Sequence, residues 1–175
     1  GAGRVGYYAI QWARQAGATV IATASNDEDR ALCESLGADA VVNHRESDWG
    51  RQVLAATGGE KVQRVIDVEF GANLPQVMEC AAIGCTIATY SSTQVREPQL
   101  PFLQMMFMDL TIRMVIVYAM PESAKAHAVA DITAALESDS LRHRIAHVVP
   151  LQEQARAHEL IEQGGFGGCV VISID

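Results

Sequence analysis

The sequence lacks the features that mark several large classes of protein. No apolar run approaches the roughly 18 residues that a membrane-spanning helix requires, and no basic segment followed by an apolar one forms a secretion signal. Basic residues are scarce, with 13 Lys and Arg against 21 Asp and Glu, and the net charge of -8 is opposite to that of a nucleic-acid-binding surface. We therefore expect a cytoplasmic protein that acts on small molecules and contacts neither membrane nor nucleic acid.

Cysteine and histidine are also scarce, and their spacing forms no metal-binding pattern. The 4 cysteines are scattered through apolar stretches, where a thiol packs as a small hydrophobic group. A zinc site needs paired Cys or His ligands at short spacing, and neither pairing occurs. No arrangement of nucleophile, acid and base is visible either. The residues themselves therefore predict no metal site and identify no catalytic residue.

The chain opens with a glycine pattern. Its first six residues read G-x-G-x-x-G and lead directly into a helical pattern. In a dinucleotide-binding unit the first Gly makes a tight turn, the second lets the backbone approach a pyrophosphate, and the third lets helix and strand pack closely. The following helix N-terminus offers N–H groups and partial positive charge to the phosphates. The predicted phosphate-binding residues are Gly1, Gly3, Arg4, Val5 and Gly6.

Short apolar strands alternate with helices through most of the chain. Strands are predicted over 19–23, 40–42, 64–68, 85–90 and 110–118, and helices over 5–16, 29–36, 48–57, 74–82 and 121–138. Continuously apolar strands separated by helices indicate parallel crossovers, with helices on both faces of the sheet. We predict an α/β fold, a Rossmann-like doubly wound parallel sheet that lacks its first strand.

The end of the chain predicts a separate helix-strand tail. A short apolar run at 146–149 precedes a helix over 152–163, a glycine stretch and a terminal strand over 169–174. The one plausible boundary lies near 141–145. We therefore predict a Rossmann-like domain over 1–143 and a tail over 144–175.

Four segments in this order resemble the medium-chain dehydrogenase/reductases. They are GAGRVGYYAIQWARQAGATVIATAS, LGADAVVNHRE, GCTIATYSS and the closing AHELIEQG with VVI. The resemblance covers essentially the whole chain and is greatest to the zinc-independent quinone oxidoreductases. It implies an NADPH cofactor, no zinc, and hydride transfer to a quinone or another activated carbonyl compound.

The same resemblance implies that parts are missing. In the family a separate N-terminal domain supplies most of the substrate pocket and any catalytic zinc, and the tail packs with that domain. We expect a piece of a longer reading frame or a natural truncation, and this chain alone is not expected to hold the full catalytic site. Three functions stay open: the cofactor-binding portion of an oxidoreductase, a truncated nucleotide-binding or oligomerisation module without catalysis, and a relative of zinc-dependent alcohol dehydrogenases.

Cofactor preference depends on the end of the strand at 19–23. An acid there would accept hydrogen bonds from the adenosine ribose of NAD, but this chain has Ala24. Ser25, Asn26 and Arg30 are candidate donors to a 2′-phosphate, so we expect NADP in preference to NAD. The same Ser-Asn-Asp stretch also fits a helix N-cap, and both interpretations can hold. Asp29 would repel a phosphate and relax the preference.

The resemblance adds candidates at the same edge of the sheet. His44 stands where the family commonly carries a Tyr near the 2′-phosphate. Phe70 lies at the carboxyl end of the strand at 64–68, the edge where ligands bind in open α/β sheets. Tyr90 and Ser91 occupy the same edge one strand later, in the loop that borders the nicotinamide in the family. Asp67 precedes Phe70, and we interpret it either as a ligand contact or as a structural hydrogen-bonding residue.

Two expectations concern strands without partners. The strand Leu110–Val117 is too apolar for an exposed edge, and the family often joins two Rossmann sheets there, so we expect a homodimer through it. The missing first strand would leave a slot between the strands at 19–23 and 65–68. One hypothesis is that residues 170–174 fill this slot, from the same chain or from a partner; direct closure and an upstream strand are the alternatives.

Overall fold

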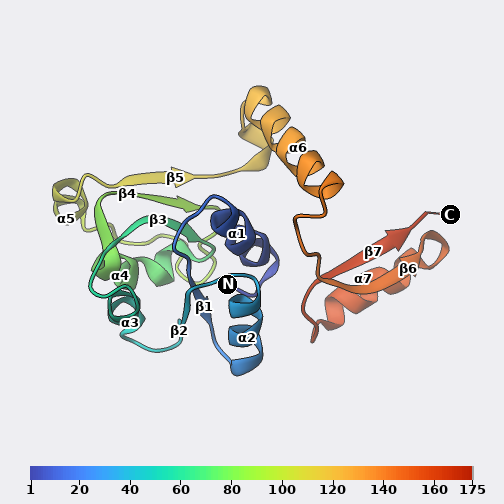
Figure 1. Ribbon diagram of the computed structural model, residues 1–175, viewed down its shortest axis with the longest axis horizontal. Helices are drawn as coiled ribbons and strands as arrows, with labels where there is room; N and C mark the ends of the chain where they lie inside the picture. Colours follow the sequence, from blue (N-terminus) through green and yellow to red (C-terminus); the bar gives the residue numbers. More distant parts are fainter. Residues whose placement is uncertain (175) are drawn as a thin grey trace.

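Helices and strands alternate along residues 1–174, which the computed structural model describes (Figure 1). The order begins α1 (Arg4–Gln15), β1 (Ile21–Ala24), α2 (Asp27–Ser35), β2 (Ala40–Asn43), α3 (Trp49–Ala56), β3 (Val62–Asp67), α4 (Phe70–Cys80) and β4 (Ala81–Thr89). It continues with α5 (Phe102–Phe107), β5 (Thr111–Met114), the 3-10 helix η1 (Val117–Ala119), α6 (Glu122–Glu137), β6 (Ile145–Pro150), the 3-10 helix η2 (Leu151–Glu153), α7 (Gln154–Gln163) and β7 (Cys169–Ser173).

Every strand pair is parallel, as the alternation of strands and helices predicts. β1 pairs with β2, the strands β3, β4 and β5 form one sheet in that order, and β6 pairs with β7. Among residues 1–174, no ladder joins β1 to β3. The predicted Rossmann-like α/β architecture is therefore confirmed. The two sheets β1-β2 and β3-β4-β5 belong to the part of the chain from α1 to α6, called the main domain below, and the first strand was expected between them.

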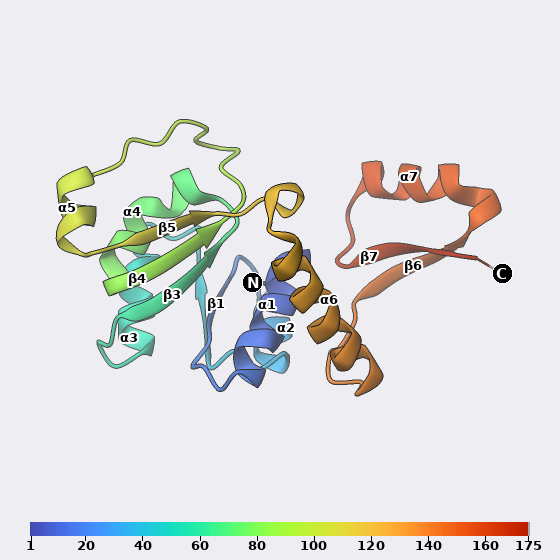
Figure 2. The ribbon, with the colours of Figure 1, turned by 90° about the horizontal axis from the view of Figure 1, so that it is seen from above.

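The hypothesis that the terminal strand fills this place is wrong within this chain. β7 pairs instead with β6, with Val148 opposite Val171 and Val149 opposite Ile172. The helix α7 joins these two strands, so they form a local β-α-β unit that lies to one side of the main domain (Figures 1 and 2). Pairing strands that are close in sequence closes a shorter loop than insertion into the distant slot would, which explains the outcome.

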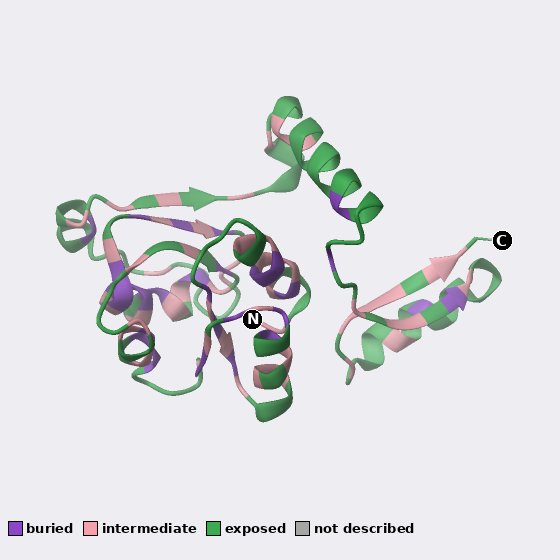
Figure 3. Ribbon diagram, viewed as in Figure 1, coloured by how far each residue is buried: buried purple, intermediate pink, exposed green. Residues whose placement is uncertain are grey.

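Buried hydrophobic side chains of the main domain form two clusters, one around each of its sheets. Figure 3 shows the buried residues in purple along the ribbon. Tyr7 and Cys33 belong to the cluster around β1, and Leu74 and Ile87 to the cluster around β4. Three of the four cysteines are buried and free, which agrees with their predicted role in packing. Burial raises the pKa of the Cys80 thiol to about 11, so that thiol is protonated at neutral pH.

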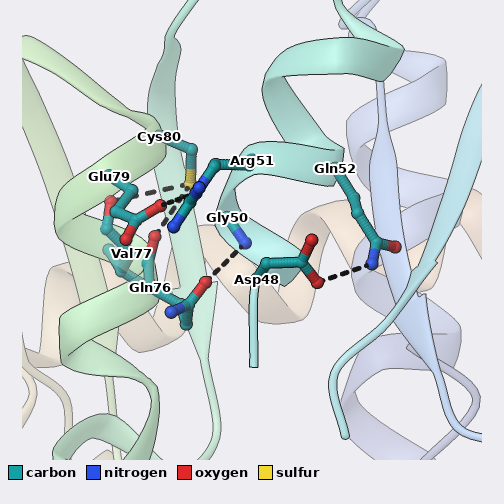
Figure 4. A network of polar contacts seen from close by, with 8 residues as sticks. All are labelled: Asp48, Gly50, Arg51, Gln52, Gln76, Val77, Glu79 and Cys80. Carbon is teal, nitrogen blue, oxygen red and sulfur yellow. Dashed lines mark hydrogen bonds and ion pairs between the residues drawn. The ribbon is translucent and has the colours of Figure 1, made fainter. Parts of the chain in front are cut away.

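The helices α3 and α4 pack closely because Gly50 has no side chain (Figure 4). A Cβ at this position would lie 2.4 Å from the carbonyl oxygen of Gln76. The Gly50 N–H donates to Oε1 of Gln76 at 2.9 Å, and Arg51 forms an ion pair with Glu79 at 3.4 Å. This contact fixes α4, whose first residue, Phe70, follows β3 at the candidate site.

Two local predictions need correction. The strand predicted over 110–118 ends at Met114, and the chain then turns into η1. No helix was predicted between the strands at 85–90 and 110–118, but α5 lies there, with Pro101 as its N-cap residue. None of the helices described over residues 1–174 is long and apolar enough to cross a membrane.

Candidate functional site

The glycine pattern forms a tight turn in which two glycines allow close packing and one faces open space. A Cβ on Gly6 would lie 2.3 Å from the Gly1 carbonyl oxygen, and one on Gly1 would lie 2.8 Å from Sγ of Cys33. A Cβ on Gly3 would meet nothing within 4 Å. These are the roles that a phosphate-binding glycine turn requires: close backbone packing at its ends and an accessible backbone in the middle.

The start of α1 adds favourable electrostatics to this turn. Gly3 is its N-cap residue and provides no side-chain hydrogen bond, and the first turn contains no acidic residue. Arg4 is exposed at the first helical position. Uncapped N–H groups, the helix dipole and the open space at Gly3 together fit a phosphate group of a dinucleotide.

After the end of β1, two side chains that were predicted to donate to a phosphate, Asn26 and Arg30, form hydrogen bonds within the protein. Asn26 caps α2, because its Oδ1 accepts the Asp29 N–H at 2.8 Å while its Nδ2 donates to the Asp29 carboxylate at 2.9 Å. Arg30 donates to the carbonyl oxygen of Val41 in β2. Ala24 is buried and Ser25 half-buried. The N-cap interpretation of Asn26 is thus the one that the structure shows.

His44 follows β2 at the same edge of this sheet. Partial burial lowers its pKa, and the positive charge of Arg45 lowers it further, against the opposing charge of Asp29. A lowered pKa favours the neutral imidazole at neutral pH.

The second group of predicted residues lies at the carboxyl edge of β3 and β4. The Phe70 N–H donates to the Ser91 carbonyl oxygen at 2.9 Å, while the Phe70 ring is only 3% exposed and belongs to the core. Tyr90 is 53% exposed. Asp67 is buried and accepts hydrogen bonds from the Glu69 N–H at 2.7 Å and the Asn73 side chain at 2.9 Å. The structural interpretation of Asp67 therefore describes its contacts, and the Phe70 side chain is not on the surface of the site.

Two contacts at the glycine turn were not predicted. Arg4 Nε donates to the Gly168 carbonyl oxygen at 3.2 Å, and Arg144 Nη1 donates to that of Ala2 at 3.5 Å. These contacts join the turn to the β6-α7-β7 unit. A sequence pattern contains no signal for them because they depend on how that unit docks.

Comparison with known families identifies the chain. Residues 5–134 match the family model described as zinc-binding dehydrogenase. The chain belongs to this family. The match confirms the resemblance to medium-chain dehydrogenase/reductases, whose cofactor-binding half has this fold. Within residues 1–174, no cluster of three or more His, Cys, Asp and Glu side chains is arranged to hold a metal ion.

Individual relatives agree with this assignment. The chain is 27% identical to the quinone oxidoreductase of Sus scrofa, over 97% of this chain and 51% of the relative. A crystal structure of an NAD-dependent alcohol dehydrogenase matches with a TM-score of 0.77 and 30% identity, over 95% of this chain and 47% of that one. A mycobacterial protein in complex with NADPH matches with a TM-score of 0.82 and 25% identity, over 99% and 55%. The chain spans about half the length of the curated relatives that it matches from end to end.

Proposed function

We propose that this chain forms the cofactor-binding portion of an NADPH-dependent oxidoreductase that transfers a hydride to a quinone or to another activated carbonyl compound. The observation that carries the proposal is the glycine turn, with open space at Gly3 beside the uncapped first turn of α1. Similarity to a quinone oxidoreductase and to a protein that binds NADPH, over nearly the whole chain, supports it.

Each group of residues has one task in this proposal. The N–H groups at the start of α1 bind the cofactor diphosphate, and the end of β1 receives the adenosine ribose beside Ser25. The edge that carries Tyr90 and Ser91 orients the nicotinamide ring. When bound, the reduced nicotinamide supplies the hydride, so the chain has to bind and orient the cofactor rather than react itself. We accordingly assign no catalytic residue within this chain.

The proposed preference for NADPH rests on Ala24. No carboxylate at this position can bind the 2′-hydroxyl of NADH or repel a 2′-phosphate. The acidic first turn of α2, with Asp27, Glu28 and Asp29, opposes the preference. We therefore expect a preference for NADPH that is modest in size.

Two other functions each have one observation in their favour. A non-catalytic oligomerisation module is favoured by the exposed apolar side chains after β5, since Val117 is 63% and Tyr118 89% exposed. A relative of zinc-dependent alcohol dehydrogenases is favoured by the description of the matching family. The absence of zinc is part of our proposal and rests on the similarity to quinone oxidoreductases.

Calorimetric titration of the 175-residue chain with NADPH and with NADH tests the proposed function. We expect both cofactors to bind, with a lower dissociation constant for NADPH. Equal affinities, or tighter binding of NADH, would contradict the preference. Failure of both cofactors to bind would contradict the proposal as a whole and favour the oligomerisation module.

A further inference from the structure

Two arginines connect the glycine turn with the C-terminal unit, one arginine from each of the two parts. Arg4 in the turn donates to the carbonyl oxygen of Gly168, and Arg144 at the start of that unit donates to the carbonyl oxygen of Ala2. The second contact joins residues that are 142 positions apart in the sequence. The Arg144 guanidinium group, which comes from the start of the C-terminal unit, therefore lies against the backbone of the candidate phosphate site.

The position of the Arg144 side chain depends on a glycine. A Cβ on Gly167 would lie 2.2 Å from the central guanidinium carbon of Arg144 and 2.3 Å from one of its terminal nitrogens. The backbone of Arg144 is also held, because its carbonyl oxygen accepts the Cys169 N–H at 2.8 Å. The guanidinium thus lies over Gly167 in space that any other residue would occupy.

Most of the hydrogen-bonding capacity of Arg144 has no partner within residues 1–174. A guanidinium has five N–H donors, and here they form one long hydrogen bond of 3.5 Å, to Ala2. Arg144 also forms an ion pair at 4.0 Å with Glu28, whose side chain is 89% exposed. An ion pair with so exposed a partner contributes little stability. A phosphate can therefore compete with Glu28 for this guanidinium.

The location of the Arg144 guanidinium indicates that it would meet the adenosine half of a bound dinucleotide. Ala2 belongs to the glycine turn, and Glu28 belongs to the first turn of α2, directly after the end of β1. In this fold the cofactor passes between these two places, with its diphosphate at the turn and its ribose at the strand end. Arg30, which the sequence offers for a 2′-phosphate, is bonded to Val41 instead.

We propose that Arg144 is a cofactor-binding residue whose guanidinium binds a phosphate of the adenosine half of NADPH, either the 2′-phosphate or the adjoining diphosphate oxygens. This inference rests on the proposed function, since it assumes that NADPH binds at the glycine turn. Planar guanidinium groups suit phosphate oxygens because two N–H donors can bind together. Cofactor binding then exchanges the contact with Glu28 for a contact with phosphate.

Calorimetric titration of Arg144→Met with NADPH and NADH tests the inference. Loss of a charge-assisted hydrogen bond is expected to weaken NADPH binding by about ten- to a hundredfold. Arg144→Lys should restore part of the affinity, because it keeps the charge. The matched control is Arg156→Met, which removes the same charge from the exposed surface of α7 and should leave the affinity unchanged.

A second variant keeps every charge and changes only the position of the guanidinium. Gly167→Ala introduces a Cβ where the guanidinium lies, and the flexible Arg144 side chain has to move away. We expect weaker NADPH binding without a loss of thermal stability, which excludes unfolding as the cause.

The two cofactors distinguish the source of the phosphate. A loss for NADPH alone assigns Arg144 to the 2′-phosphate, and equal losses for NADPH and NADH assign it to the diphosphate. Unchanged affinity of Arg144→Met for both cofactors would overturn the inference while leaving the proposed function intact. Failure of the unsubstituted chain to bind either cofactor would instead overturn the proposed function, and the inference with it.

Discussion

At the residue scale, Glu69 fastens the loop after β4 to the start of α4. Its carboxylate accepts hydrogen bonds from the Thr93 N–H at 3.0 Å, the Thr93 hydroxyl at 2.6 Å and the Gln94 N–H at 2.9 Å. These bonds, above all the one from the Thr93 hydroxyl, lower the pKa of Glu69. The anchored loop follows Tyr90 and Ser91, so Glu69 helps to position the proposed nicotinamide edge.

This anchor predicts a pH-dependent contribution to stability. A carboxyl group whose pKa is lowered by folding stabilises the protein above its unfolded pKa, and this stabilisation is lost as the pH falls through the folded pKa. Thermal unfolding should therefore show wild type more stable than Glu69→Gln at neutral pH, with the difference vanishing on acidification. Glu162→Gln, on the exposed surface of α7, controls for the loss of one charge. A difference that stays constant across the acidic range would contradict this role.

At the element scale, local patterns predicted the presence of most strands and helices, while their ends depended on contacts. The strand predicted over 19–23 lies at Ile21–Ala24, and the helix predicted over 121–138 lies at Glu122–Glu137. The helix predicted to start at residue 74 begins at Phe70. Asp67 accepts hydrogen bonds there from the N–H of the N-cap residue Glu69 and from the Asn73 side chain. Such side-chain contacts between neighbouring elements have no periodicity, so no pattern reveals them.

The strand β5 and the segment after it expose apolar side chains to solvent. Within residues 1–174 β5 pairs only with β4, so its other edge has no partner strand in this part of the chain. Met114 is 74% exposed, and the segment that follows, 116–118, is exposed and apolar. An apolar strand edge of this kind is a surface for pairing with another chain. The homodimer expected through Leu110–Val117 therefore stays a proposal, although the strand is shorter than predicted.

Replacing Ile116 with Lys tests the proposed dimer. Ile116 is 57% exposed, so a lysine there leaves the fold of the single chain intact but places a charge within the interface. Sedimentation velocity should show a dimer for wild type and a shift toward monomer for Ile116→Lys. Ile145→Lys, at a 54% exposed position in β6, is the matched control and should remain dimeric. A dimer that is unchanged by Ile116→Lys would place the interface elsewhere.

At the scale of the whole molecule, polar contacts connect α1 to the segment between α6 and β6, which leads into the C-terminal unit. The Gln11 side chain accepts the Arg142 N–H at 2.8 Å and donates to the Arg142 carbonyl oxygen at 3.2 Å, and Gln15 donates to the Ser140 carbonyl oxygen at 2.7 Å. Both glutamines lie on α1, the helix that follows the glycine turn. The docking of the tail and the geometry of the proposed cofactor site therefore share one helix.

Contacts between distant parts of the molecule could not be predicted from the sequence. The motif at Gly1–Gly6 predicted the turn because its geometry is local, and the structure shows the expected packing at Gly1 and Gly6. The contact of Arg144 with Ala2 joins segments that are distant in the sequence, and it was not predicted; the pairing of β7 with β6 was not predicted either. A pattern in neighbouring residues indicates an element, but it contains no information on which element a tail will contact.

The central claim is that the glycine turn binds the phosphates of NADPH, and Gly3→Asp tests it most directly. An Asp at this position meets no protein atom within 4 Å of its Cβ, and it is a favourable N-cap for α1, so the free energy of unfolding should stay equal or rise. The same carboxylate occupies the phosphate site and repels an anion.

Calorimetric titration with NADPH compares wild type, Gly3→Asp and the control Gln163→Glu, which adds the same charge at the exposed end of α7. Our account predicts that Gly3→Asp weakens NADPH binding by at least about tenfold while the chain remains as stable as wild type. The control should bind NADPH as wild type does. Undiminished binding of NADPH by a folded Gly3→Asp variant would contradict the account, because the cofactor phosphates would then lie away from this turn.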